Sequence, residues 1–173
     1  IGVGLVGSEM CIRDSGFYKE LAAANVSADK IPVVAFSVGE EELSGLDTSN
    51  LVGHLAAWNY FQSADSEIND EFIKAWKARM GNKRVTNDPM EAHYIGFNMW
   101  VNAVKQAGTT KVDAVRTAMY GQKFPNLTGG MAEMLPNHHL SKPVLIGEIK
   151  ADGQFDIISQ TEPVPGDAWT DFL

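Results

Sequence analysis

The first third of the chain alternates between helix-like and strand-like hydrophobic patterns. Apolar residues at helical spacing over residues 17–24 predict a helix that ends in the polar stretch after it. The β-branched run 31–36 predicts a short strand of the kind that is buried on both faces in a parallel sheet. Three glutamates at 40–42 suit the first turn of a helix, because they offset the positive end of its dipole. Residues 53–60 predict a second strand.

The middle of the chain predicts three helices. Asn69 is expected to cap the first, which ends at Gly81. Its apolar face is expected to hold Phe72, Ile73, Trp76 and Met80. The second helix follows Pro89 and closes at Gly108. Its buried stripe is expected to be Tyr94, Phe97, Val101 and Val104.

The third helix is expected to begin at the capping-box-like segment 110–113 and to stop at Gly121. Its inward residues are expected to be Val112, Val115 and Met119. Residues 121–137 are rich in turn formers and predict no helix.

Two strands, 144–149 and 154–158, are expected near the end of the chain. The tripeptide Ala-Asp-Gly at 151–153 between them is a strong hairpin signal. Because strands and helices alternate before this hairpin, the sequence predicts an α/β fold with a parallel sheet.

Composition narrows the class of protein. The 173 residues are 45% apolar and 21% charged, as in ordinary globular domains. A net charge of −8 opposes nucleic-acid binding, which needs a basic surface. No apolar run reaches the roughly 18 residues of a membrane-spanning helix. Cys11 is the only cysteine, so neither an intramolecular disulfide nor a thiolate metal site is expected.

Residues 1–15 are expected to be foreign to the fold. The string VGSEMCIRDS at 6–15 resembles a translated sequencing adapter. On this interpretation the native sequence begins near Gly16, and the chain is a fragment cut at its N-terminal side.

An ordered series of motifs then carries a family resemblance. The series is FYKEL at 17–21, SVGEEEL at 37–43, GHLAAWNYF at 53–61, and NHHL at 137–140 followed by IGEI at 146–149. It resembles the urea-type solute-binding proteins of ABC importers, over about residues 16–173. It is similar, more distantly, to the amide-sensing regulator and to branched-chain amino-acid binding proteins.

The resemblance implies a type I periplasmic binding fold, in which three crossover strands join two α/β lobes and the ligand lies between them. It assigns residues 16–61 to the second lobe, 62–148 to the returning part of the first lobe, and 149–173 to the final crossover and second-lobe return. It further implies an extracytoplasmic, periplasmic protein that binds urea or a short amide and docks on ABC permease subunits, with no cofactor. An amide sensor of the same fold and a branched-chain amino-acid binding protein remain alternatives.

The candidate ligand site follows the strand at 31–36. Ligands of open α/β sheets bind at the carboxyl ends of strands. Urea and short amides present N–H donors and one carbonyl acceptor, so Glu40 or Glu41 can accept from them and Ser37 can donate or accept. The choice between the two glutamates stays open, and so does the simpler interpretation that they only decorate an exposed helix start.

Tyr60 is the best ligand-facing candidate among the aromatic residues near the end of the second strand. Such rings can instead pack between the lobes as ordinary core. On the ligand interpretation, Tyr60→Ala is expected to weaken urea binding without unfolding the protein.

The sequence does not favour an enzyme or a metal site. It lacks a Gly-x-Ser-x-Gly elbow, a P-loop and a His-Glu-x-x-His motif. His138 and His139 are adjacent and would point to opposite faces of a strand, so they cannot readily chelate one ion. His54 and His93 are expected to be polar core or surface residues.

Overall fold

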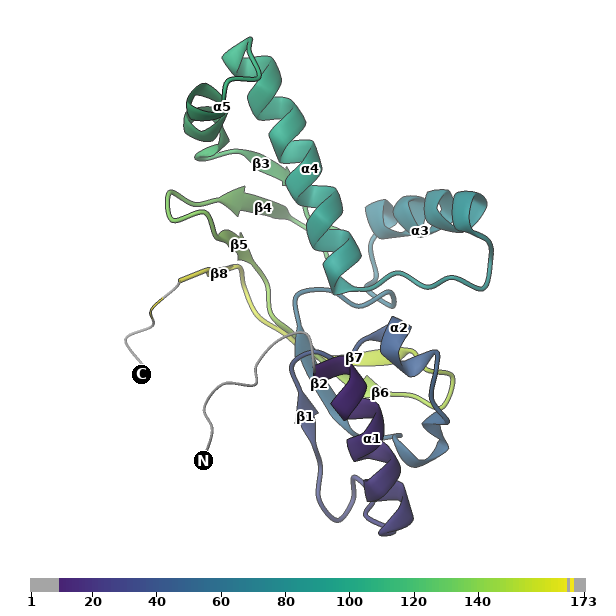
Figure 1. The fold of residues 1–173 in the computed structure, drawn as a ribbon. Coiled ribbons are helices and arrows are strands. Elements are labelled where there is room, and N and C mark those ends of the chain that lie inside the picture. Colours follow the sequence, from purple (N-terminus) through teal and green to yellow (C-terminus); the bar gives the residue numbers. More distant parts are fainter. Residues whose placement is uncertain (1–9, 168, 170–173) are drawn as a thin grey trace.

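The computed structural model describes residues 10–167 and residue 169. Figure 1 shows two bodies, one above the other, which we call lobe A (lower) and lobe B (upper). Lobe A contains the helices α1 (Met10–Ala23) and α2 (Glu40–Leu43), the 3₁₀ turn η1 (Thr48–Asn50), and the strands β1 (Val34–Ala35), β2 (Leu55–Trp58), β6 (Leu145–Ile149) and β7 (Phe155–Gln160). Lobe B contains the helices α3 (Glu67–Met80), α4 (Asp88–Ala107) and α5 (Val112–Met119), and the strands β3 (Lys123–Pro125), β4 (Met131–Met134), β5 (Leu140–Lys142) and β8 (Val164–Pro165).

The chain passes between the lobes at three places. The first crossover is residues 59–66, between β2 and α3. The second is residues 143–144, between β5 and β6, and the third is residues 161–163, between β7 and β8. These passages arrange the described residues as parts of two lobes on a common hinge (Figure 1). The lobe boundaries expected from the sequence, 61/62 and 148/149, stay a prediction about the complete fold.

Sheet A runs in the order β1-β2-β6-β7. Its first pair is parallel and the other two are antiparallel. The predicted hairpin is confirmed, because β6 pairs with β7 and the backbone N–H of Gly153 bonds to the carbonyl of Lys150 at 3.1 Å in the turn. Sheet B, in the order β3-β4-β5-β8, is entirely antiparallel. The parallel sheet expected from the sequence is therefore wrong for the described residues, in which β1–β2 is the one parallel pair. Short turns join β3 to β4, β4 to β5 and β6 to β7, and such turns make neighbouring strands antiparallel.

The expectation that the strand at 31–36 is buried on both faces is wrong. β1 is only two residues long, and Ile31, Val34 and Phe36 are all exposed, Phe36 to 70%. The burial alternates along the strand: Val33 and Ala35 pack against the core of lobe A, whereas Val34 and Phe36 are exposed, so among the described residues only one face is covered.

The core of lobe A is closely packed around the start of the first crossover. Phe61 is fully buried, and its ring lies 4.4 Å, centroid to centroid, from that of Phe155. A Cβ atom added to Gly147 would lie 2.8 Å from Cε2 of Phe61 and 3.0 Å from Cβ of Phe155. Glycine is therefore the one residue that fits at position 147 without displacing these two side chains.

We expect Gly147→Ala to lower the free energy of unfolding by about 1–3 kcal/mol, since the added methyl group must displace a buried ring. Gly96→Ala in α4 is the matched control, because a Cβ at that glycine meets nothing within 4 Å. It should stabilise the protein slightly, by up to about 1 kcal/mol, through helix propensity. Equal effects of the two changes on guanidinium unfolding would contradict this packing.

Helix α3 is capped by Ser66 and not, as expected, by Asn69. The Ser66 hydroxyl accepts from the backbone N–H of Asn69 at 3.2 Å. The Asn69 side chain is instead buried and donates to the carbonyls of Gln62 and Ala64. Asn69 thus binds the first crossover to lobe B, a role that cap statistics cannot reveal. The predicted end at Gly81 is confirmed.

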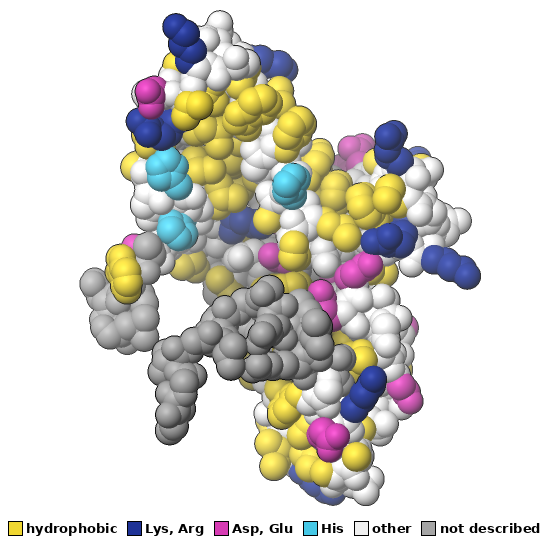
Figure 2. All heavy atoms as spheres, in the orientation of Figure 1, with side chains coloured by type: hydrophobic (Ala, Val, Ile, Leu, Met, Phe, Trp, Pro, Cys, Tyr) yellow, Lys and Arg dark blue, Asp and Glu magenta, His cyan; other side chains and the backbone are white. Residues whose placement is uncertain are grey.

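Helix α4 buries a different face from the one expected. Its buried residues are Glu91, Ile95, Met99 and Ala103, which recur every four positions. Phe97, expected inside, is 58% exposed and stacks on Trp100, while the other residues of the expected stripe are half-buried. Both faces are apolar enough to fit helical spacing, and contact with sheet B selects between them. Figure 2 shows apolar side chains gathered on the outer surface of lobe B. The closing Gly108 is confirmed, with left-handed backbone.

Helix α5 packs on α4 through Val115 and Ala118, with Met119 partly buried beside them. Val112, expected inside, is 77% exposed because it occupies the first position of the helix, one turn before this contact. The expected capping box is also absent from this helix start, because the N-cap residue is Lys111 and its side chain makes no capping hydrogen bond.

Candidate functional site

The site loop, residues 37–41, leaves the carboxyl end of β1 and enters α2. Gly39 is the N-cap residue, and its backbone N–H donates to Oε2 of Glu42 at 2.9 Å. A Cβ on Gly39 would lie 2.6 Å from Cζ3 of Trp58, so the loop is pressed against β2. This close approach fixes the direction in which the following glutamates leave the sheet.

Glu40 points from α2 towards the first crossover. Its Oε1 accepts a hydrogen bond from the backbone N–H of Gln62 at 2.6 Å, and only 1% of the residue is exposed. Its Oε2 is buried and has no hydrogen-bond partner among the described residues. Burial raises the pKa of Glu40 to about 8. The interpretation that the glutamates only decorate an exposed helix start is therefore wrong for Glu40.

Glu41 has the opposite character. It is half-buried, and its Oε1 lies 3.0 Å from Nη2 of Arg84 in an ion pair at the surface. Arg84 belongs to the segment after α3, so this pair connects the site loop of lobe A to lobe B. An exposed pair of this kind adds little stability, and its atoms are accessible to solutes.

Tyr60 lies inside the hinge. It has no exposed surface, and its hydroxyl is 2.8 Å from both Oδ1 of Asn69 and Oγ1 of Thr86. Burial raises its pKa, so the phenol stays protonated. The structure thus brings Ser37, Glu40 and Glu41 together in one loop and places Tyr60 behind it, in contact with lobe B. Ser37 is half-buried at the start of this loop.

Several residues that hold the crossovers were not anticipated from the sequence. Asp88 accepts from the backbone N–H of Asn59 at 3.0 Å, and Glu91 forms a buried ion pair with Lys142. Burial raises the pKa of Asp88 and raises that of Glu91 to about 7, although Lys142 opposes both shifts. The Asn-Asp-Pro start of α4 signalled only a helix cap, and nothing local marks Lys142 as buried.

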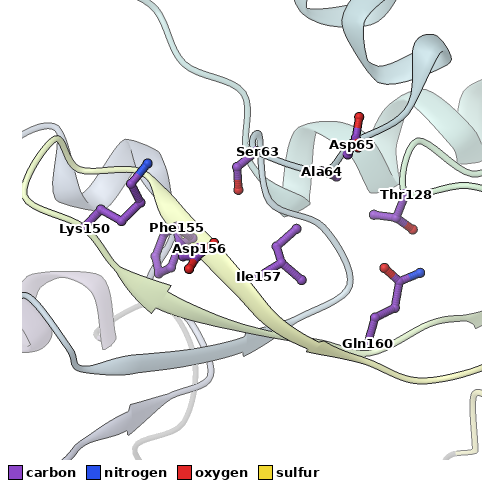
Figure 3. A pocket seen from close by; sticks show the side chains of 9 residues that line it. All are labelled: Ser63, Ala64, Asp65, Thr128, Lys150, Phe155, Asp156, Ile157 and Gln160. Carbon is purple, nitrogen blue, oxygen red and sulfur yellow. The ribbon is translucent and has the colours of Figure 1, made fainter.

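A polar cavity of about 370 Å³ lies elsewhere between the lobes. Figure 3 shows it beside β7, with Ile157 and Gln160 reaching up towards Ser63 and Thr128. This cavity contains none of the residues expected to bind ligand.

The described residues give no support to a metal or a membrane-spanning role. Among them, no three His, Cys, Asp or Glu side chains lie together as a possible metal site. His54 is buried, and its Nδ1 accepts from the backbone N–H of Val33 at 3.1 Å, as a core residue would. None of their helices has the length and apolar character needed to cross a bilayer. The side chain of Cys11 lies outside the residues whose side chains are described.

Two α/β bodies joined by three crossovers define the class of the fold, that of the type I periplasmic binding proteins. Residues 5–173 match the model of the periplasmic binding protein domain family, so the chain belongs to this family. The expected fold class is confirmed.

Solved structures show the same fold. A solute-binding protein of an ABC transporter from Rhodopseudomonas palustris BisB5, in complex with 3,4-dihydroxybenzoic acid, matches with a TM-score of 0.76 and 20% identity, over 92% of this chain and 44% of that one. A periplasmic ligand-binding protein of a branched-chain amino-acid ABC transporter from Burkholderia xenovorans LB400 matches with a TM-score of 0.72 and 14% identity, over 87% and 41%. The chain therefore spans less than half of each of these structures.

A curated Geobacillus stearothermophilus protein named limonene hydroxylase is 35% identical over 114 residues, which are 65% of this chain and 21% of that protein. Because the match covers about a fifth of that protein, its name assigns no activity to the chain.

Proposed function

We propose that the chain is part of the solute-binding component of an ABC importer, and that it binds urea or a short amide between its two lobes. The observation that carries the proposal is the site loop, which holds Ser37, Glu40 and Glu41 at the carboxyl end of β1 and bonds to both the first crossover and lobe B. A ligand that binds to this loop is therefore coupled to movement of the hinge between the lobes.

The charge around the loop favours an uncharged ligand with N–H donors. Glu41 and Glu42 belong to α2, Asp88 acts electrostatically on Glu40 from the start of α4, and the nearby cation Arg84 is already paired with Glu41. A carboxylate ligand such as a benzoate would be repelled here. Urea and short amides offer donors to these oxygens and bring no negative charge.

The family supports an extracytoplasmic location, a non-enzymatic role and permease subunits as partners. In the proposed cycle, ligand shifts the lobes from an open to a closed population, and the closed form docks on the permease. The amide sensor of the same fold would use the same site without this docking.

The test is calorimetric titration of the full-length gene product with urea, acetamide, leucine and 4-hydroxybenzoate. We expect heat of binding with urea or acetamide and none with 4-hydroxybenzoate. Binding of leucine or the benzoate alone would overturn the ligand assignment and leave the family standing.

The loop also makes a site-directed prediction. Ser37→Ala should weaken urea binding about 3- to 10-fold, the net value of one hydrogen bond. Ser159→Ala, in β7, removes the same hydroxyl group from an exposed position away from the site loop and is the matched control. Equal affinities for both variants and the wild type would remove Ser37 from the site.

A further inference from the structure

We propose that Glu40 is a positioning residue whose buried carboxyl group fastens the site loop to the first crossover. This inference rests on the proposed function only in naming residues 37–41 as the ligand loop. It separates Glu40 from Glu41: the first holds the loop in place, and the second is available to the ligand.

The geometry of Glu40 supports a fastening role. With 1% of its surface exposed, the residue has almost no area to offer a ligand, yet its Oε1 is 2.6 Å from the backbone nitrogen of Gln62. This bond joins α2 to the first crossover and spans 22 positions of sequence. The loop position is therefore coupled directly to the hinge backbone.

The side chain of Gln62 contacts both lobes. Its side-chain oxygen accepts from the backbone N–H of Thr86 in lobe B at 2.8 Å. Its side-chain nitrogen donates to Oε1 of Gln154, in the hairpin of lobe A, at 2.9 Å. A change in the Glu40 bond acts at a point where the site loop, lobe A and lobe B meet.

The backbone N–H groups of Gln62 and of Glu40 itself favour the carboxylate and lower its pKa, but burial outweighs them. The charged groups that face Glu40 favour the neutral acid. Glu42 from α2 and Asp88 from the start of α4 are both acidic and disfavour a further negative charge, and the nearby phenol of Tyr60 is uncharged. Among the described residues, two cations that could offset a negative charge already have acidic partners: Arg84 pairs with Glu41, and Lys142 pairs with Glu91. Burial is the largest cause that raises the pKa of Glu40 from 4.5 to about 8.

The raised pKa of Glu40 makes the stability of the folded state depend on pH. Because the folded pKa lies above the unfolded value, the stability associated with Glu40 is complete below about pH 4.5 and is lost as the pH rises through about 8. Above that pH the ionised carboxylate gains hydration by turning towards solvent, and this movement breaks its hydrogen bond to the backbone N–H of Gln62. The loop is then released from the crossover.

The test follows the Gln62 amide proton by NMR in the full-length gene product, without ligand, from pH 6 to 9.5. In the wild type we expect its resonance to titrate with a midpoint near pH 8, and its protection against hydrogen exchange to fall beyond the ordinary base-catalysed slope. Glu40→Gln keeps an accepting oxygen and cannot ionise, so this titration should vanish while protection persists. Glu41→Gln is the matched control and should titrate like the wild type.

A wild-type titration that survives in Glu40→Gln would overturn the proposal, as would an unprotected Gln62 amide at pH 6. These readouts need no ligand, so they decide the role of Glu40 even if urea and acetamide fail to bind. Where an amide does bind, its affinity should fall several-fold between pH 7 and pH 9 in the wild type and stay constant in Glu40→Gln. Weak binding by Glu40→Gln at every pH would instead make Glu40 a direct ligand contact.

Discussion

Lys142→Met is expected to lower the free energy of unfolding by about 3–5 kcal/mol at pH 8, because Glu91 loses its cation and stays buried, either as an unpaired carboxylate or as an acid that must take up a proton at this pH. Both side chains are almost fully buried, and they connect β5 to the first turns of α4. The loss should shrink towards pH 5.5. Removal of Lys142 raises the pKa of Glu91 further above its present value of about 7, so the carboxyl group is neutral at low pH and the missing cation matters less.

Unfolding by guanidinium chloride measures this effect, since urea is the proposed ligand and would stabilise the folded state by binding. Lys123→Met is the matched control: its ion pair with Glu133 is exposed, so the change should cost less than about 1 kcal/mol. The double change Glu91→Gln with Lys142→Met should recover part of the lost stability. Equal losses from Lys142→Met and Lys123→Met would contradict the buried pair.

Tyr60→Ala is expected to cost about 3–5 kcal/mol of unfolding free energy, the usual range for deleting a fully buried aromatic ring. The change also removes the hydroxyl that joins Asn69 and Thr86 within lobe B. This differs from the effect expected from the sequence, a change in urea affinity without unfolding. Affinity can be compared only after the stability of the variant has been measured.

Tyr60→Phe separates the two contributions of this side chain. It keeps the ring and removes the hydroxyl, so it should cost about 1–3 kcal/mol through unsatisfied polar partners. Thermal unfolding of both variants is the measurement. If Tyr60→Ala proves as stable as the wild type and loses only urea affinity, Tyr60 faces the ligand and its position inside the hinge is wrong.

The α-helices and one hairpin were predictable because their signals are local, whereas the four strands of sheet B were not anticipated. The Ala-Asp-Gly turn and its flanking alternation determine the β6–β7 hairpin, and Gly108 ends α4 where the sequence places it. Which face a helix buries is a different question. Phe97 and Met99 are both apolar residues of α4, and only the position of sheet B decides that Met99 is inside.

The position of the candidate site in the fold was predictable from the sequence, whereas the hydrogen bonds of its residues were not. A polar loop after a strand in an α/β fold is a sound basis for a ligand hypothesis. The partners of Glu40 and Tyr60 lie up to 26 positions away in sequence, at Gln62, Asn69 and Thr86. No periodicity reports such long-range hydrogen bonds, and they distinguish the buried Glu40 from the half-buried Glu41.

The most direct test of the proposed function is a crystal structure of the full-length gene product grown with urea or acetamide. We expect electron density for the amide between the two lobes, within hydrogen-bond distance of Ser37 or Glu41. Density for the amide at the cavity beside β7 alone, or an empty site loop in crystals that bind leucine or a benzoate between the lobes, would contradict it.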